Sequence, residues 1–456
     1  MTAAHRTPPC DTAVLRGLVA SLSSVSASDD TDRVDLLRVL EELKCAAAGV
    51  QARVTVEFAA SQRAAQEAAG VPARRVGLGV AAQVALARRE SPHRGQQHLG
   101  LAHALVEMPY TADALSRGRI TEWRATILAR ETACLSRADR ATVDAEVAAI
   151  PGGLEALGDR ATQAAARRVA YRLDPYAFTR RAAKAESERT VTLRPAPDTM
   201  THLTGLLPVR GGVAVYAALT RHADTLRCAG DARTRGQIMA DTLVERVTGQ
   251  ATATAVPVEV NLVMTDSALL HGDPTPAHVP GYGPVPAPLA RQWLAGGGAG
   301  TGCPDQDAGL DEETRVFLRR LYTAPDHTTL VAMDTTRRHF TGGLRKLIGL
   351  RDQHCRTPWC DAPIRHIDHP QRHTDGGPTT ATNSQSLCEA CNHAKEAPGW
   401  SARPDPHGGH DHAIGTTTPT GHHYRSRPPP LTAPRATAPP ARPRLDLHYA
   451  DVALIA

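Results

Sequence analysis

The segment from residue 355 to residue 395 decides the fold of the C-terminal part of the chain, and it reads CRTPWCDAPIRHIDHPQRHTDGGPTTATNSQSLCEACNHAK. Its cysteines form two pairs, C-x4-C at Cys355 and Cys360 and C-x2-C at Cys388 and Cys391. Two such pairs supply the four thiolates that a tetrahedral zinc ion requires. We therefore predict a structural Zn²⁺ site, which takes no part in catalysis because four thiolates leave no position for water. The alternative is four reduced thiols without a metal.

The composition of the 456-residue chain favours a soluble, mostly helical protein of two or three domains. Aromatic residues make up only 4% of the chain, so Ala, Leu and Val must build its cores. No apolar run approaches the ~20 residues that a membrane span needs, and the N-terminus lacks the pattern of a secretory signal. Nine cysteines, an odd number of which five are scattered, favour a reduced compartment over a disulfide framework. We expect a cytoplasmic protein without a membrane partner.

Hydrophobic periodicity and composition divide the chain into four parts. Residues 1–30 are rich in Ser, Thr and Asp and are predicted to be a flexible N-terminus. Residues 31–325 are predicted to form a mainly helical domain with a small α/β part. Residues 326–425 form a second domain around the cysteine pairs. Residues 426–456, rich in Pro, Ala and Arg, are predicted to be a disordered tail.

Apolar residues at three- and four-residue steps predict the helices of the chain. One opens at Asp32 or Asp35 and continues to Phe58. The others are Val80–Arg89, Leu101–Met108, Ile120–Ala133, Ala141–Ala149, Ala161–Leu173, Val213–Leu226, Thr234–Val247 and Glu312–Leu321. Period-two alternation predicts strands at Thr190–Leu193, Met200–Leu206 and Val256–Met264. The Pro/Gly-rich stretch Gly272–Gly302 is predicted to be a linker or long surface loop.

Positive charge gathers around the first cysteine pair, although the whole chain carries only +5. Between Arg337 and Arg372 there are eight Lys or Arg residues and three Asp residues. Positive charge of this density suits a polyanion such as nucleic acid. The alternative interpretation is a solvated basic face.

Residues suited to phosphodiester hydrolysis lie between the cysteine pairs. His369 is the predicted general base, because imidazole titrates near neutral pH. Asp368 offers a hard oxygen ligand for Mg²⁺ or Mn²⁺. Neighbours on a strand point to opposite faces, so the two converge only if Pro370 ends the strand there. His366 lies on the same face as Asp368 and is the rival base.

Further candidates surround this pair. Asn392 is the predicted second oxygen ligand, with His393 as its rival. Asn383 is predicted to bond the backbone or the ring near His369 and so to fix its orientation, although such an Asn alone is more often a turn residue or a helix cap. The predicted phosphate contacts are Arg365, Arg372 and Lys395. The histidines that follow are interpreted as a polar hairpin rather than a metal site; they are His407, His410, His412, His422 and His423.

The order of these residues resembles the HNH endonuclease family. Members carry Asp-His at the end of a hairpin strand, a Gly-Gly loop, an Asn five residues before a Cys, and C-x-x-C followed by Asn or His. This chain has Gly376-Gly377, Asn383 and Asn392 in those places, within a match over about residues 343–400. The resemblance implies a ββα-metal (HNH, His-Me finger) fold, DNA as partner and substrate, and one catalytic Mg²⁺ or Mn²⁺.

The same resemblance implies a role for each matched residue. His369 would be the general base, Asp368 and Asn392 the ligands of the divalent ion with His393 as the alternative, and the four cysteines the zinc ligands. The implied activity is that of a metal-dependent endonuclease, a hydrolase of DNA phosphodiester bonds. The alternative is a zinc-stabilised nucleic-acid-binding protein without catalysis.

The N-terminal part resembles the helical domain of unknown function, DUF222 type, found ahead of HNH modules in many actinobacterial proteins. The segments that carry this resemblance are GLLPVRGGVAVYAALTRHAD at 205–224 and DARTRGQIMADTLVERVTG at 231–249. It supplies no activity, and an interaction or oligomerisation module is a third hypothesis. The expected architecture is a mainly α N-terminal domain with a small α/β part, followed by a zinc-braced ββα-metal domain. The oligomeric state stays open.

Overall fold

The computed structural model describes residues 11–149, 153–250, 264–279, 282–294, 339–405 and 412–430. Contacts divide the chain into two compact units, Met1–Val84 with His93–Ala183, and Ala85–Pro92 with Lys184–Ala456. No helix within the described ranges is both long and apolar enough to cross a membrane. The strand predicted at Val256–Met264, except for its last residue, and the helix predicted at Glu312–Leu321 lie outside the described residues.

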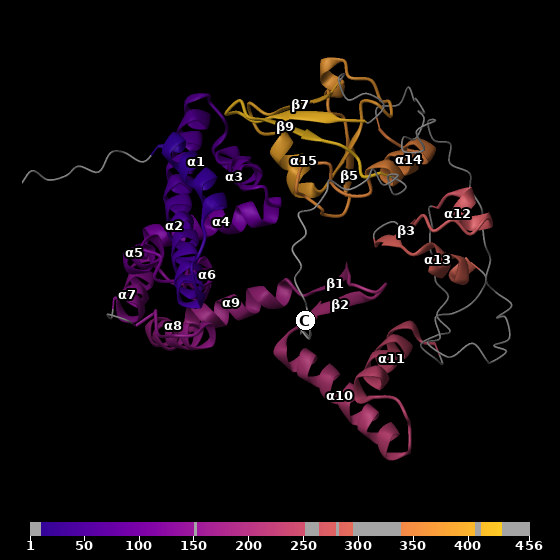
Figure 1. Ribbon diagram of the computed structural model, residues 1–456, viewed down its shortest axis with the longest axis horizontal. Coiled ribbons are helices and arrows are strands. Elements are labelled where there is room, and N and C mark those ends of the chain that lie inside the picture. The colour runs from indigo at the N-terminus through magenta and orange to yellow at the C-terminus, as the bar shows by residue number, and fades with distance from the viewer. Residues whose placement is uncertain are drawn as a thin grey trace, which may run out of the picture. The chain divides into compact units, whose positions relative to one another are not determined.

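The N-terminal part is built from helices, drawn in indigo and magenta in Figure 1. In chain order they are α1 (Thr12–Ser21), α2 (Asp30–Ala68), α3 (Val80–Arg88), α4 (Pro92–Val106), α5 (Pro109–Ser116), α6 (Glu122–Glu131), α7 (Arg137–Ala148), α8 (Asp159–Leu173) and α9 (Pro175–Ser187). Helix α2 packs against α5, α6 packs against α8, and α7 packs against both α5 and α8.

The core of this helical unit is made mainly of small and aliphatic side chains, as the scarcity of aromatic residues predicts. Met108, Leu115, Ile120 and Leu128 are its largest fully buried members, each at most 2% exposed. Helices α2 and α5 approach closely because α2 has Gly49 at the crossing. A Cβ on Gly49 would lie 2.8 Å from Ser116 Cα, so no larger residue fits without moving a helix.

Three helices of this N-terminal part, α1, α5 and α9, are not predicted by the sequence patterns. Pro109 and Pro175 are interpreted there as helix ends, but they are the first residues of α5 and α9. Proline is favoured at that position because the missing N–H has no partner in the first turn anyway. Helix α1 is capped by Asp11, whose carboxylate accepts two backbone N–H groups. Helix α1 thus lies within residues 1–30, which the sequence predicts to be a flexible N-terminus, and none of its residues is buried.

The other predicted helices and strands within the described residues are confirmed, with differences at their ends. The predicted helix ending at Phe58 is the longer α2, and the two predicted short strands are β1 (Thr190–Pro195) and β2 (Thr201–Leu206). These strands pair antiparallel in a hairpin. Helices α10 (Val209–Cys228) and α11 (Arg235–Thr248) follow.

The predicted linker at Gly272–Gly302 is wrong for the part of it that the structure describes. That region follows helix α12 (Asp266–Leu270) and contains strands β3 (Ala277–Val279) and β4 (Gly283–Val285) and helix α13 (Ala287–Leu294). The small core of this hairpin and helix includes Ala277, Val285 and Ala290, each at most 1% exposed. Strands this short carry too few alternating residues to produce a recognisable pattern among prolines and glycines.

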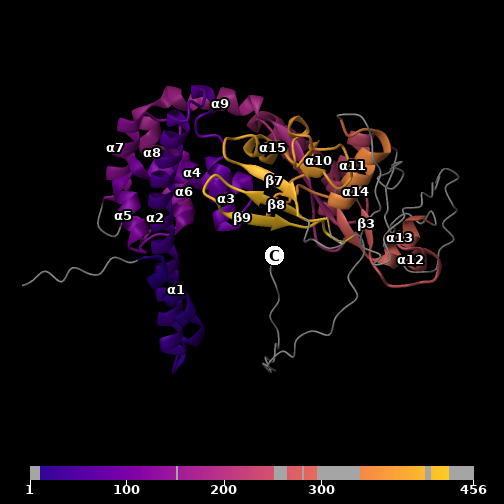
Figure 2. The same ribbon diagram turned by 90° about the horizontal axis from the view of Figure 1, so that it is seen from above.

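The C-terminal part combines short helices with short antiparallel strands. In chain order its elements are α14 (Gly342–Asp352), β5 (His366–Asp368), β6 (Gln385–Leu387), α15 (Glu389–Lys395), β7 (Ser401–Pro404), β8 (Ile414–Thr417) and β9 (His423–Ser426). Strands β5 and β6 pair with each other, and β7, β8 and β9 form a separate sheet in that order. Figure 2 shows these three strands side by side. His423 pairs with Thr417 across the β8–β9 hairpin, which confirms a polar hairpin there; His407 and His410 lie outside the described residues.

A buried carboxylate joins two helices of the N-terminal unit and gives a test of its packing. Asp144 of α7 is fully buried and accepts hydrogen bonds from the backbone N–H groups of Tyr110 and Thr111, at 2.8 and 3.0 Å, at the start of α5. Asp144→Ala leaves both donors without an acceptor, so we expect the free energy of unfolding to fall by about 3 kcal/mol. Urea unfolding followed by circular dichroism measures this. Asp35→Ala, which removes an exposed carboxylate, is the control, and an equal effect of both variants would contradict the capping role.

Candidate functional site

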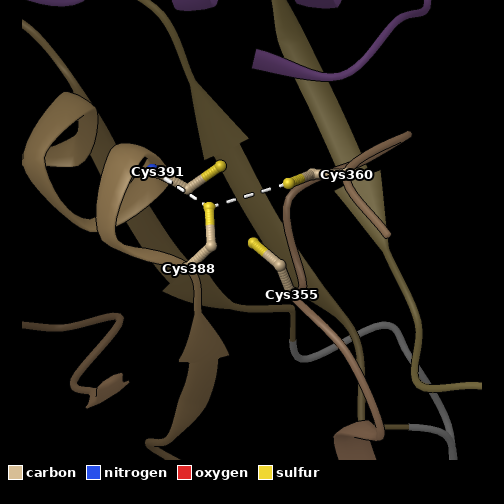
Figure 3. A group of neighbouring side chains, drawn as sticks. All are labelled: Cys355, Cys360, Cys388 and Cys391. Atoms are coloured by element: carbon tan, nitrogen blue, oxygen red, sulfur yellow. Dashed lines mark hydrogen bonds between the residues drawn. The ribbon is translucent and has the colours of Figure 1, made fainter. Parts of the chain in front are cut away.

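Four cysteine sulfurs meet in the C-terminal part of the chain. Cys355 and Cys360 follow α14, whereas Cys388 and Cys391 lie at the start of α15, and all four side chains are buried. Their Sγ atoms lie within 4.8 Å of one another. Figure 3 shows the sulfurs pointing toward a common centre. Residues 33 positions apart in the sequence thus form one cluster, as the spacing of the two pairs predicts.

The dimensions of the cluster fit a tetrahedral ion such as zinc. Zinc–sulfur bonds of about 2.3 Å in a tetrahedron place neighbouring sulfurs about 3.8 Å apart. The distance from Cys360 Sγ to Cys388 Sγ is 3.7 Å. A disulfide bond would bring two sulfurs to about 2.0 Å, so this spacing is that of a ligand set and not of a covalent pair. The four cysteines can therefore hold a structural metal.

The crowded sulfurs also change one another's acidity. Hydrogen bonds from Cys355, then from Cys360 and Cys391, lower the pKa of Cys388. The interaction with Cys355 raises the pKa of Cys360 and of Cys391. Several thiolates at such short distances repel one another unless a cation lies between them. Four thiolates can therefore coexist in this cluster only with a cation between them.

Asp368 and His369 lie where strand β5 ends. Asp368 is the last residue of β5 and pairs with Gln385 of β6. Its carboxylate Oδ2 lies 2.5 Å from Lys395 Nζ and accepts a hydrogen bond from Gln385 Nε2 at 3.2 Å. Lys395 Nζ also donates to the carbonyl oxygen of His369 at 3.0 Å. One ammonium group therefore joins α15 to both residues of the Asp-His pair.

The imidazole of His369 is held by residues that the sequence patterns do not indicate. Its Nε2 lies 2.9 Å from the hydroxyl of Thr379, which is 5% exposed. The ring of Phe340 packs against it with centroids 4.5 Å apart, and the ring of His373 lies at 5.7 Å. A hydroxyl at one ring atom and an aromatic ring on one face fix the orientation of the imidazole.

Asn383 holds the loop after His369, not the imidazole ring itself. Its side chain accepts the N–H of Gln371 at 3.0 Å and donates to the carbonyl oxygens of Gln371 and Pro378, at 3.0 and 2.8 Å. The loop closes so tightly that a Cβ on Gly377 would overlap Gln371 O. Only glycine, which has no Cβ, fits at position 377. Asn383 thus acts on His369 through the backbone that follows it, while Thr379 contacts the ring.

The two rival metal ligands lie on different faces of α15. Asn392 precedes Lys395 by three residues and so shares the helix face that Lys395 turns to β5. His393 precedes it by two residues, which places it on the opposite side. Asn392 is partly buried and His393 is exposed. The geometry therefore favours Asn392 as the residue near Asp368. His366, the rival base, lies on β5 opposite Leu387 and is exposed.

The three predicted phosphate contacts differ in their surroundings. Arg365 is exposed, and Arg372 is paired with Glu396 at 3.2 Å on the surface. Lys395 is only 8% exposed, so it does not lie on a solvated helix face. A cavity of about 150 Å³ lies beside it, and Arg372, Asp375 and Arg403 contribute to its lining. Of these, Arg403 is a basic residue that the sequence analysis does not single out.

A buried ionic network stands beside the cysteine cluster. The carboxylate of Asp352 is fully buried and accepts two hydrogen bonds from Arg351, at 2.7 and 3.0 Å, and one from Arg356 at 2.8 Å. The backbone N–H of Ser386 donates to it as well, at 2.8 Å. Burial acts to raise the pKa of Asp352, but the two arginines outweigh it, and the pKa is lowered. The carboxylate therefore stays charged in the interior.

The two arginines carry this network to other elements. Arg351 donates to the carbonyl oxygen of Ser384 at 3.0 Å, next to β6. Arg356 donates to the carbonyl oxygens of His412 and Ser426, at 2.9 and 3.0 Å, beside β8 and in β9. Both side chains are at most 7% exposed. Arg351 and Arg356 therefore do not belong to the predicted basic surface, because both side chains are buried and Asp352 neutralises one of their two charges.

The architecture and this site define a class of protein: a helical domain followed by a segment that four cysteines and a buried ionic network hold together. A model of the family described as "Domain of unknown function (DUF222)" matches residues 37–293, more than half of the chain, and the chain belongs to this family. The match confirms the N-terminal resemblance. It ends before the cysteine cluster and assigns no activity. No curated protein and no solved structure matches the chain.

Removal of one cysteine tests the metal centre. We expect Cys391→Ser to reduce bound zinc from about one ion per chain to almost none, because three thiolates hold a structural zinc much more weakly than four. Elemental analysis of the purified protein measures the metal directly. Cys228→Ser is the matched control, since Cys228 is exposed and lies outside the cluster. Full zinc content in Cys391→Ser would contradict the site.

His412 predicts a dependence of stability on pH. Burial, then the charges of Arg351 and Arg356, lower its pKa to about 4. Its Nδ1 lies 3.2 Å from Arg356 Nη1 and its Nε2 2.9 Å from the carbonyl oxygen of Thr382, so the neutral ring accepts from the first and donates to the second. His412 is protonated near pH 6.5 in the unfolded chain but only near pH 4 in the folded chain. Stability contributed by His412 is thus present above pH 6.5 and is lost between these values.

The measurement compares the wild type with His412→Gln, which cannot titrate. We expect the stability difference between them to shrink by about 3 kcal/mol from pH 7 to pH 4, as urea unfolding at each pH reports. His423→Gln removes an exposed histidine of the same sheet and is the control. A difference that does not change with pH would show that His412 titrates alike in the folded and unfolded chains.

Proposed function

We propose that the chain is a metal-dependent HNH endonuclease that hydrolyses DNA phosphodiester bonds. The observation that supports this most directly is the junction at the end of β5. Asp368 ends the strand, His369 follows it, and Lys395 of α15 contacts both. A carboxylate and an imidazole beside a buried ammonium group provide a cation ligand, a base and a fixed geometry, which are what hydrolysis of a charged ester needs.

The order of elements supports an HNH finger. Strands β5 and β6 are antiparallel, the Gly376-Gly377 loop joins them, and α15 follows and contacts β5. This order corresponds to the ββα-metal arrangement that the family resemblance implies. Strands of three residues bury little surface, so zinc on the cysteine cluster would supply the stability that the segment lacks.

The donor set suits a hard divalent ion. Asp368 is 20% exposed, so its carboxylate is accessible, and Asn392 offers an amide oxygen from the facing side of α15. Carboxylate and amide oxygens are the ligands that Mg²⁺ and Mn²⁺ prefer. When bound, the ion supplies positive charge beside the leaving oxygen of the phosphodiester. The residues present therefore fit such an ion.

His369 would act as the general base. The Thr379 hydroxyl and the Phe340 ring hold its imidazole in one orientation. The imidazole takes a proton from the water that attacks phosphorus, which a group titrating near neutral pH does efficiently. Asn383 keeps the following loop in place and so preserves the position of His369 when substrate binds.

Basic side chains near this junction would hold the DNA backbone. Arg365 and Arg403 are exposed, and Arg372 lies with Arg403 at the cavity beside Lys395. Phosphate contacts of this kind position the duplex without reading its sequence. The choice of DNA over RNA rests on the resemblance to HNH endonucleases. The DUF222 domain adds no activity of its own to the proposal.

One observation favours the alternative, a zinc-stabilised nucleic-acid-binding protein without catalysis. Lys395 already neutralises Asp368, so the junction is electrically balanced without a divalent ion. Such a protein would bind DNA in a salt-dependent way, would need no Mg²⁺ and would leave the DNA intact. The two functions therefore differ in a single measurement, which is the cleavage of DNA in the presence of divalent metal.

The test uses the full-length protein, loaded with zinc, on supercoiled plasmid. We expect nicking with Mg²⁺ or Mn²⁺ and none without added metal. His369→Ala should lower the rate by about 10²–10⁴-fold, the usual contribution of a general base. Gel separation of supercoiled and relaxed plasmid gives the rate.

Matched variants decide between the rival residues. His366→Ala should keep nearly wild-type nicking, and His393→Ala should be affected much less than Asn392→Ala. Unchanged nicking in His369→Ala, or DNA that binds in every metal but is never cut, would reject the endonuclease in its proposed form. The second result would support the alternative.

A further inference from the structure

Lys395 is a charged residue that the proposed chemistry does not use directly. Its side chain is 8% exposed, although it belongs to a short helix at the surface of the C-terminal part. Burial of an ammonium group is costly unless a carboxylate or several acceptors lie against it. Here Asp368 Oδ2 at 2.5 Å, His369 O at 3.0 Å and Glu396 Oε1 at 3.4 Å surround it.

The two recorded contacts of the Asp368 carboxylate fall on the same oxygen. Lys395 Nζ and Gln385 Nε2 both reach Oδ2, from α15 and from β6 respectively. Among the residues that the structure describes, no contact to Oδ1 is recorded. A carboxylate held through one oxygen from two sides cannot rotate freely, so the other oxygen has a defined position.

We propose that Lys395 is the internal counter-ion of Asp368, and that it sets both which carboxylate oxygen is offered to a divalent cation and how tightly that cation is held. Lys395 is a positioning residue, because it contacts neither substrate nor the reacting atoms. This inference rests on the proposed function, since the cation is the one that Asp368 and Asn392 would hold.

The electrostatic consequence has a definite sign. A divalent cation held by Oδ1 would add a second positive charge beside the ammonium on Oδ2, and the two positive charges would repel each other. Lys395 therefore weakens cation binding while it stabilises the protein that has no divalent ion. The carboxylate stays paired in both states, with Lys395 alone or with Lys395 and the cation. This arrangement would make cleavage depend on the concentration of free metal.

The experiment measures Mn²⁺ binding to the zinc-loaded, full-length protein by electron paramagnetic resonance, without DNA. We expect Lys395→Met to bind Mn²⁺ about tenfold more tightly than the wild type, because the repelling charge is gone. Lys395→Arg, which keeps the charge, should stay close to the wild type. Lys346→Met removes an exposed lysine of α14 and is the matched control. Zinc content confirms that each variant is folded.

A second readout is the unfolding temperature, measured without and with Mn²⁺. Without divalent ion, Lys395→Met should unfold at a lower temperature than Lys346→Met, and saturating Mn²⁺ should restore most of the loss. Equal or weaker Mn²⁺ binding in Lys395→Met would overturn the counter-ion role while leaving the metal site standing. If Asp368→Asn binds Mn²⁺ as tightly as the wild type does, the proposed metal site is rejected. The counter-ion role of Lys395 is then rejected as well.

Discussion

The C-terminal part of this protein depends on one buried carboxylate. Asp352 ends helix α14 without any exposure to solvent, and two arginines and a backbone N–H group satisfy it. An ion pair taken out of water is stable only when every charge has a partner, so the surrounding elements are held in one arrangement. Through Arg351 and Arg356 the same carboxylate reaches β6, β9 and the residues around His412.

This network and the cysteine cluster share a segment of chain. Arg356 is the residue after Cys355, and its backbone N–H donates to the carbonyl oxygen of Ser386, two residues before Cys388. The network therefore brings the two cysteine pairs to the same place before any metal is considered. Strand β6 between them also pairs with β5 and positions Asp368. Polar interactions in the interior therefore hold the candidate site together with a small apolar cluster that includes Phe340, Leu344 and Ile348.

Sequence patterns identified the cysteine ligand set because its chemistry is local. Each pair lies within one turn of chain, so spacing alone indicates a shared ligand position. Thr379 and Gln385 were not identified, since a hydroxyl ten residues from His369 or an amide on a paired strand has no sequence signature. The same holds for Arg351 and Arg356, which look like surface charges until Asp352 is found between them. Helices α5 and α9, which begin at Pro109 and Pro175, are not predicted for a different reason. Proline can both end one helix and begin the next, so its position alone does not distinguish the two.

The helical character of the N-terminal part, the two cysteine pairs and the order of Asp368, His369, Asn383 and Asn392 are all evident from the amino-acid sequence alone. Periodicity and spacing are properties of the sequence, so they can be recognised without knowledge of the fold. The contacts of each polar side chain, in contrast, depend on how the chain folds. Lys395 is a partner of Asp368 instead of an exposed charge, and Asn383 holds a loop instead of a ring. These contacts form because a buried charge or N–H group must find a partner, and in the folded chain that partner is often a residue distant in the sequence.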